Sequence, residues 1–214
     1  MSRRDRKGSI RSRSPRVLYI STLLAMRHKY ETRGIVLSRT LIGEASSFVT
    51  LLTAELGVVR VLVQSVRKTG AKLAPALVTF AESSFVLVRG RDGWRLAGAV
   101  LEVNWFKQLT HTESRQRAGR ICGLLLRLVP GEAHDSLLFS IVSAFFKALS
   151  VLPLETHEAV EILAALRIVT VLGFEKDDLP EGASLFAESV LVATIQNRTS
   201  YIARINQGIA ASGL

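Results

Sequence analysis

Cysteine is nearly absent from this sequence, and its absence excludes several classes of protein. The 214 residues include one cysteine, Cys122, so an internal disulfide framework and a multi-thiolate zinc site are both excluded. The four histidines are too scattered to indicate a metal cluster. No apolar run reaches the roughly 18 residues that a transmembrane helix needs, so we expect no membrane-spanning helix.

Signals of catalysis are missing too. Glycine-rich phosphate motifs of the Walker or dinucleotide type do not occur. The histidines have no partner arrangement of Ser or Cys with an acid, and Cys122 has the apolar neighbours of a buried structural thiol. The acidic run Asp177, Asp178 and Glu181 lacks the alternation of a calcium loop. We therefore expect no catalytic residue, no metal and no cofactor, and a protein that is not an enzyme.

Positive charge is abundant, and it is concentrated in the front half of the chain. The net charge is +10; residues 1–26 carry 7 basic and 1 acidic residue, residues 27–108 carry 12 and 6, and residues 109–214 carry 9 and 11. This asymmetry indicates a polyanionic partner for the front half, either nucleic acid or an anionic membrane. A basic surface kept for solubility is the alternative.

Residues 1–28 form the first unit of the predicted organisation. Ser2–Arg16 is rich in Arg and Ser and cannot build a core, so we expect it to be disordered. The apolar run Val17–Met26 leaves three interpretations open: a secretory signal, a real basic tail that attracts phosphate, or an extension upstream of a true start at Met26.

The second unit, residues 29–108, has the patterning of strands. The predicted strands are joined by short turns, and Asp92-Gly93 is a strong hairpin signal. They cover Arg33–Arg39, Phe48–Thr53, Val58–Gln64, Phe80–Val88 and Trp94–Asn104. Five strands without a long helix favour a closed barrel, because closure removes exposed edges. An oligonucleotide-binding (OB) fold fits the strand count best, and an SH3-like barrel is the alternative.

The third unit, residues 109–214, changes to helical periodicity. The first helix is expected over Glu113–Val129, and a second follows Asp135 and ends before Pro153. Thr156 is expected to cap a third helix that ends at Gly173. Two last helices are predicted over 184–196 and 199–211. The fold class is therefore α+β, an OB barrel followed by an all-helical domain.

Several short segments follow one another in a characteristic order and spacing. They are Thr32–Arg39, Gly43-Glu44, Thr50–Thr53 and Gly57 in the barrel, then Ser65–Leu73, Pro75 and Phe80, and then Leu124–Leu128, Pro130-Gly131 and Phe139 in the helices. Together these segments resemble the bacterial RecO family of recombination mediators and DNA-repair proteins, and their order and spacing carry the resemblance more than any one motif does. The similarity covers about Thr32 to Gly173.

The resemblance implies functions that composition alone does not. It implies binding of single- and double-stranded DNA, annealing of complementary strands, and help in loading a recombinase onto coated single strands. The implied partners are RecR and the C-terminal peptide of single-stranded-DNA-binding protein, with no membrane partner, and the implied location is the cytoplasm, in association with the nucleoid. Many members carry a four-cysteine zinc module after the third helix, whereas only an acidic loop follows Gly173 here. The chain would thus be a short variant without that module.

Candidate DNA-binding residues are the cations of the barrel strands and their loops. Phosphate binding needs cations on flexible stems along a shallow groove. The candidates are Arg33, Arg39, Arg60, Arg67, Lys68 and Lys72, with Arg89, Arg91 and Arg95 around the hairpin. For a peptide groove in the helical domain, the possible charge partners are Arg115, Arg117, Arg120 and Arg127, of which Arg120 and Arg127 share a helix face. Solvated surface charges are the alternative for both sets.

Aromatic residues, 7% of the chain, are expected mainly to pack in the interior. This expectation covers Phe48, Phe80 and Phe85 in the strands, and Trp94 and Trp105 beside the hairpin and the domain junction. Weak stacking suits an annealing protein, which must hold backbones and leave base edges free. The competing hypothesis is an interaction scaffold whose barrel binds a protein or a structured RNA.

Overall fold

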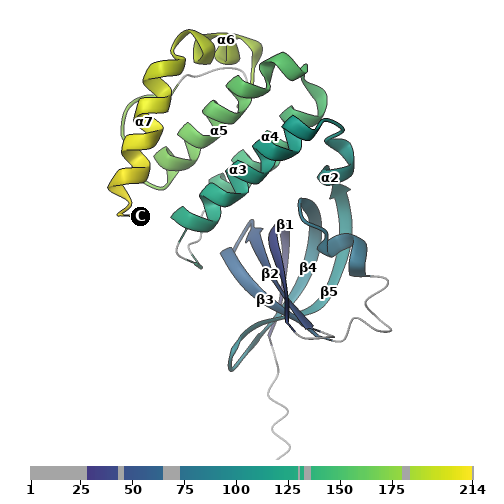
Figure 1. Cartoon of the computed structure of the whole chain (residues 1–214). Coiled ribbons are helices and arrows are strands. Elements are labelled where there is room, and N and C mark those ends of the chain that lie inside the picture. The colour runs from purple at the N-terminus through teal and green to yellow at the C-terminus, as the bar shows by residue number, and fades with distance from the viewer. Residues whose placement is uncertain are drawn as a thin grey trace, which may run out of the picture.

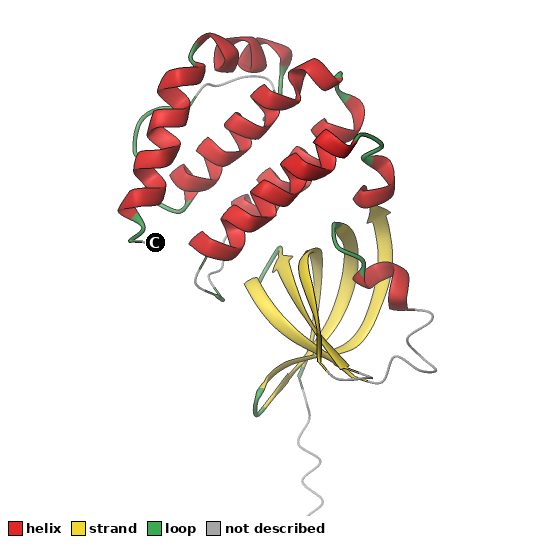
Figure 2. Ribbon diagram, in the orientation of Figure 1, coloured by secondary structure: helices red, strands yellow, loops and turns green. Residues whose placement is uncertain are grey.

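The computed structural model consists of a β-barrel followed by a layer of helices stacked over one end of it (Figure 1). It describes residues 28–42, 46–64, 73–129, 131–132, 136–179 and 184–213. Strands fill the first part and helices the second, apart from short helical turns beside the barrel (Figure 2). The predictions for residues 1–27, including the tail, lie outside the described residues.

The strands form one closed antiparallel barrel with a single parallel contact. Its order around the barrel is β1-β2-β3-β5-β4, and β3 pairs with β5 in the parallel direction. The strands are β1 (Lys29–Ile42), β2 (Ser46–Thr53), β3 (Gly57–Gln64), β4 (Ala81–Gly90) and β5 (Gly93–Asn104). The predicted five-stranded OB barrel, and with it the α+β class, is confirmed.

The long first strand closes the barrel because it pairs on both sides. Its second half pairs with β2 and its first half with β4, and the two ladders overlap at Gly34 and Ile35. A Cβ at Gly34 would lie 3.2 Å from the Leu52 carbonyl oxygen and from the Phe85 ring, so a larger residue would have to push these neighbours aside at this crossing. Strand β1 is longer than the predicted Arg33–Arg39 because it serves two partners.

Alternation along β2 and β3 divides their side chains between two faces. Val49 and Leu51 of β2, and Val59 and Val61 of β3, fill the barrel interior. Residues of the other parity point outward. Among these, Leu52 and Val58 lie under the helices and join the helical core, together with Ile35 and Leu37 of β1. The same outer face carries polar residues farther from the helices.

Eight helical segments follow or flank the barrel strands in the described ranges. They are η1 (Ala74–Leu77) between β3 and β4, then α2 (Trp105–Gln108), α3 (Thr112–Leu128), α4 (Ser136–Val151), η2 (Leu154–Thr156), α5 (His157–Val171), α6 (Glu188–Gln196) and α7 (Arg198–Ala211), with the two η segments being 3-10 helices. Helix α5 is the most buried and packs against α3, α4, α6 and α7. None of the helices in these ranges combines the length and hydropathy needed to cross a membrane.

Of the two caps predicted for α5, the structure contains one and lacks the other. Gly173 has a φ of +77°, and the backbone N–H groups of Gly173 and Phe174 donate to the carbonyls of Thr170 and Val169, so the predicted glycine cap is present as a Schellman motif. At the other end, Thr156 occupies the cap position, but its hydroxyl donates to the Pro153 carbonyl oxygen. The prediction that the Thr156 side chain caps α5 is therefore wrong.

Phe80 turns the chain into β4 instead of beginning that strand as predicted. Its φ is +67°, a left-handed conformation that is rare for a bulky residue. Its backbone N–H donates to the Val36 carbonyl oxygen at 2.9 Å. Its ring lies against the rings of Phe106 and Phe146, at centroid distances of 6.4 and 5.4 Å. Phe80 thus helps to join the barrel to the helices.

A buried carboxylate completes this junction. Glu82 of β4 is 1% exposed and accepts hydrogen bonds from Trp105 Nε1 and Ser143 Oγ, each at 3.0 Å. Arg33 of β1 forms an ion pair with the same carboxylate. One side chain therefore connects β1, β4, α2 and α4, and a carboxylate can be buried there because every contact to it is a donor.

Candidate nucleic-acid interface

A groove lies on the outer face of β2 and β3. It has a volume of about 740 Å³, and its walls come from β2, β3, the β4–β5 hairpin, the end of α3 and residues 131–132. We call it the β2–β3 groove; it is lined by Phe48, Thr50, Val58, Val59, Arg60, Arg89, Asp92, Gly93, Trp94, Leu126, Val129, Gly131 and Glu132. The outer face of these two strands is where OB folds bind oligonucleotides and oligosaccharides.

An arginine stacked on an aromatic ring forms the floor of this groove. The Arg60 guanidinium carbon lies 3.9 Å from the centroid of the Phe48 ring, across the β2–β3 ladder. Arg60 is exposed, and no ion pair to it exists among the described residues. Phe48 is half-buried and belongs to neither hydrophobic core, so the prediction that it packs inside is wrong. Phe48 and Thr50 are two residues apart in β2, so their side chains point to the same outer face. The polar Thr50 was the signal in the sequence that this face is not the barrel interior.

The hairpin side of the groove holds a second arginine–aromatic pair. The Arg89 guanidinium carbon lies 4.9 Å from the centroid of the Trp94 ring, and Tyr30 contacts the same ring edge-on at 5.0 Å. Trp94 is 6% exposed, as is Trp105, so the predicted packing of both indoles is confirmed. The two arginines, Arg60 and Arg89, thus line one groove although 29 residues separate them.

Glu132 brings a negative charge into the same groove. Its Oε1 accepts hydrogen bonds from Arg89 Nη1 and, at 2.9 Å, from Trp94 Nε1. The hydrogen bond from Arg89 lowers the pKa of Glu132, although partial burial opposes it, and the indole hydrogen bond adds to the decrease. Glu132 is therefore ionised at neutral pH. Sequence reasoning missed this residue because nothing local distinguishes it from a solvated acid.

The remaining barrel candidates lie in different surroundings. Arg33 is held by ion pairs with Glu82 and Glu102, and it lies 5.7 Å from the Phe139 ring. Arg39 is exposed near the end of β1, and Arg91 is exposed in the hairpin turn. Arg95 faces Asp92 at 3.8 Å. Arg67, Lys68 and Lys72 lie outside the described residues, so their predicted role stays a prediction.

The arginines of α3 contact the protein itself, with one exception. Arg117 and Arg120 both pair with Glu161 of α5, and the hydrogen bond from Arg120 to Glu161 raises the pKa of the arginine. Arg115 donates to the Leu109 carbonyl oxygen and covers the Phe106 ring at 4.5 Å. Arg127 is exposed near the end of the helix and has no ion pair within the described ranges.

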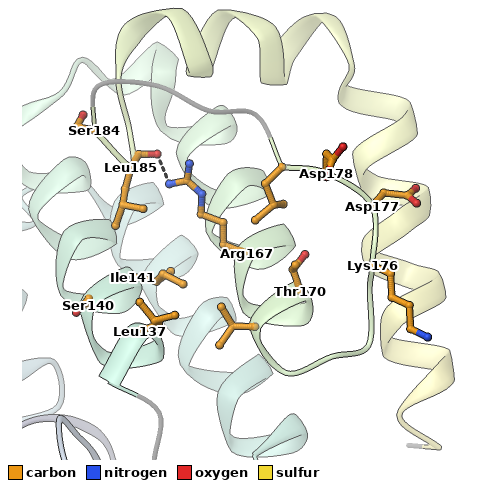
Figure 3. Close-up of a pocket in the computed structure, with 12 residues that line it drawn as sticks. Leu137, Ser140, Ile141, Arg167, Thr170, Lys176, Asp177, Asp178, Ser184 and Leu185 are labelled. Carbon is orange, nitrogen blue, oxygen red and sulfur yellow. Dashed lines mark hydrogen bonds between the residues drawn. The ribbon is translucent and has the colours of Figure 1, made fainter.

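A second groove, of about 770 Å³, lies on the helical domain between α4, α5 and the chain after α5 (Figure 3). Leu137, Ile141 and Val171 give it apolar walls, and Arg167 donates to the Leu185 carbonyl oxygen at one side. Arg167 is 5% exposed, and burial lowers the pKa of its guanidinium. Its position within the apolar run of α5 gave no sign of this groove in the sequence.

Cys122 is a structural thiol, as the sequence predicts. It is 3% exposed in α3, and desolvation raises its pKa to about 12. Since only the thiolate attacks a disulfide reagent, about one molecule in 10⁴ is reactive at pH 8. We expect native protein to react at least a hundredfold more slowly than urea-unfolded protein when a chromogenic disulfide reagent is followed by absorbance. Equal rates would show that the thiol is accessible.

The protein is an OB-fold protein of the α+β class. This follows from the strand order of the barrel, from the position of the groove on β2 and β3, and from the helices stacked over one end of the barrel. Residues 26–101 match the family described as "Recombination protein O N terminal". A protein of Dehalococcoides mccartyi named "DNA repair protein RecO" is 29% identical over 115 residues, which cover 54% of this chain and 46% of that protein. One of Synechococcus with the same name is 28% identical over 151 residues, covering 63% and 53%.

The barrel region is therefore similar to the RecO N-terminal family, and the resemblance predicted from the sequence is confirmed. The match spans about half the length of each of these curated relatives. Within the described residues, no group of three or more His, Cys, Asp or Glu side chains is placed to hold a metal ion.

Proposed function

We propose that this chain binds single-stranded DNA in the β2–β3 groove and acts in DNA repair and recombination by annealing complementary strands. The observation that carries the proposal is the exposed Arg60–Phe48 stack on the outer face of β2 and β3. A planar guanidinium over a ring offers a base a flat surface and a phosphate a charge in the same place. Such contacts serve any sequence.

Annealing needs a groove that grips the backbone without covering base edges. The β2–β3 groove suits this because it opens to solvent and, among the described residues, contains two ring–arginine pairs. Its polar side-chain groups are those of the charged residues, the hydroxyl of Thr50 and the indole N–H of Trp94. Such groups suit contacts with phosphate better than sequence-specific contacts with base edges. The chain would then act without nucleotide hydrolysis, as a mediator and not as an enzyme.

Contacts with RecR and with the C-terminal peptide of single-stranded-DNA-binding protein are part of the proposal and rest on the resemblance. The groove beside Arg167 is the candidate for the peptide, since it joins apolar walls to a guanidinium. Asp177 and Asp178 line its other side, so an acidic peptide would lie toward Arg167. Recombinase loading onto coated strands and a cytoplasmic, nucleoid-associated location belong to the same proposal.

The experiment is an annealing assay with two complementary oligonucleotides, without nucleotide or metal, at several salt concentrations. We expect the protein to accelerate duplex formation, and Arg60→Gln to weaken single-strand binding about tenfold for every sequence tested. The slope of log affinity against log salt should fall by about 0.7, the share of one phosphate on a single strand. Arg198→Gln, which removes the same charge from α7, is the matched control and should change neither quantity.

Two outcomes would contradict the proposal. The first is a wild-type protein that binds no single strand at low salt. The second is an Arg60→Gln variant that binds like Arg198→Gln, which would move the site away from this groove. Selective binding to a structured RNA, with no effect on annealing, would favour the scaffold hypothesis.

A further inference from the structure

Two hydrogen-bond donors of the barrel converge on one oxygen atom, and this oxygen belongs to a residue outside the barrel. Arg89 Nη1 and Trp94 Nε1 both donate to Oε1 of Glu132, which follows α3. The Arg89 guanidinium also lies over the indole ring, so the two donors keep a constant relation to each other. A charged donor and a neutral donor aimed at one point form a small site for an anionic oxygen.

We infer that the Glu132 carboxylate occupies the place of a backbone phosphate oxygen, and that a single strand must displace it to reach Arg89 and Trp94. This inference rests on the proposed function, because it concerns the same groove. A phosphate oxygen and a carboxylate oxygen carry similar charge and accept the same donors. Binding would therefore be an exchange of one anion for another at a preformed pair of donors.

The Arg89–Glu132 ion pair is suited to such an exchange because both side chains are exposed to solvent. The side chains of Arg89 and Glu132 are 49% and 46% exposed. Ion pairs of this exposure change an equilibrium constant by at most about fivefold, so a phosphate can compete with them. Gly131, in front of Glu132, has a φ of +119°, and a Cβ there would meet nothing within 4 Å.

Release of Glu132 would also change the charge of the groove. Two arginines, Arg60 and Arg89, face two acids, Asp92 and Glu132, among its described lining residues. The lining is neutral while the carboxylate is in place and becomes positive once it leaves. Glu132 would thus weaken non-specific binding of single anions, while a strand that contacts Arg60 and Arg89 together gains enough to displace it.

The test compares Glu132→Gln with the wild type, using a fluorescently labelled oligothymidylate in an anisotropy titration. Glutamine keeps the side-chain shape and loses the charge. We expect up to about fivefold tighter binding, the equivalent of an exposed ion pair that need no longer be broken. The salt slope should be steeper by up to about 0.7, because Arg89 is then free to neutralise a phosphate.

Two further variants separate this effect from a general change in charge. Glu188→Gln removes one negative charge from α6, away from the groove, and should tighten binding far less. In the Arg89→Gln background, Glu132→Gln should give no gain, since the donor that the carboxylate blocks is gone. A gain of equal size in all three comparisons would overturn the inference, as would weaker binding by Glu132→Gln.

A measurement without DNA tests the contact itself. The chain has two tryptophans, so an amide-region NMR spectrum contains two indole N–H resonances. Glu132→Gln should move one of them, and adding oligothymidylate to the wild type should move the same one. If neither change occurs while Arg60→Gln still weakens binding, the exchange is wrong and the groove assignment remains. If no variant and no wild-type protein binds, the proposed function itself fails.

Discussion

Replacing Glu82 with alanine should lower the free energy of unfolding by about 2–4 kcal/mol. The substitution leaves the buried indole N–H of Trp105 and the hydroxyl of Ser143 without their acceptor, and each unsatisfied donor costs about 1–3 kcal/mol. It also frees Arg33 from one of its two carboxylates. Urea denaturation followed by tryptophan fluorescence measures the change, since Trp105 contacts the residue directly.

Glu102→Ala is the matched control for this prediction. Glu102 pairs with the same arginine, Arg33, at 3.1 Å, but its side chain is 31% exposed and can be replaced by water. We expect a loss of less than about 1 kcal/mol, the usual worth of an ion pair at the surface. Equal losses for the two variants would mean that the buried position of Glu82 does not matter, contrary to the structure.

Phe48→Ala should weaken binding of single-stranded DNA by about tenfold or more, because stacking on an aromatic ring contributes about 1–3 kcal/mol per base. The substitution also removes the surface on which the Arg60 guanidinium lies at 3.9 Å. Stability should change little, since Phe48 belongs to neither hydrophobic core. Anisotropy titration of labelled oligothymidylate at low salt gives the affinity.

Phe48→Tyr keeps a ring at the same position and should bind within about threefold of the wild type, because stacking depends on the ring face. Arg60→Lys keeps the charge but not the flat group, and should fall between the wild type and Phe48→Ala. Wild-type affinity in Phe48→Ala, with the fold intact by circular dichroism, would remove base stacking from the proposed site.

The barrel could be predicted from the sequence because its signals are local. The β-branched run Val58–Gln64, the Asp92-Gly93 turn and the lack of a long helix before Asn104 all indicate short antiparallel strands. Arg60 was also identifiable, as a single charge in an apolar strand. The proposed role of Arg60 depends on its stacking against Phe48 of the neighbouring strand, and this contact can be predicted only if the register between β2 and β3 is known.

Other features depend on contacts between distant parts of the chain. Glu132 meets Arg89 and Trp94 from a segment 38 or more residues away, and Arg120 meets Glu161 across 41 residues. Nothing near these residues in the sequence distinguishes a paired charge from a solvated one. The sequence therefore could not distinguish Arg33, which pairs with a carboxylate of the protein, from the open Arg60 within the predicted DNA-binding set. Nor could it show that Arg120, of the separate predicted partner-binding set, pairs with Glu161.

The outer face of β1, β2 and β3 has a mechanical consequence. Its upper residues, Leu52 and Val58 among them, are embedded among the helices, while Phe48 and Arg60 of the same two strands line the groove. Tilting these strands would separate the side chains of Leu52 and Val58 from the helices against which they pack. If a nucleic-acid strand binds at Arg60 as proposed, tension on that strand would pass along β2 and β3 into the helical layer.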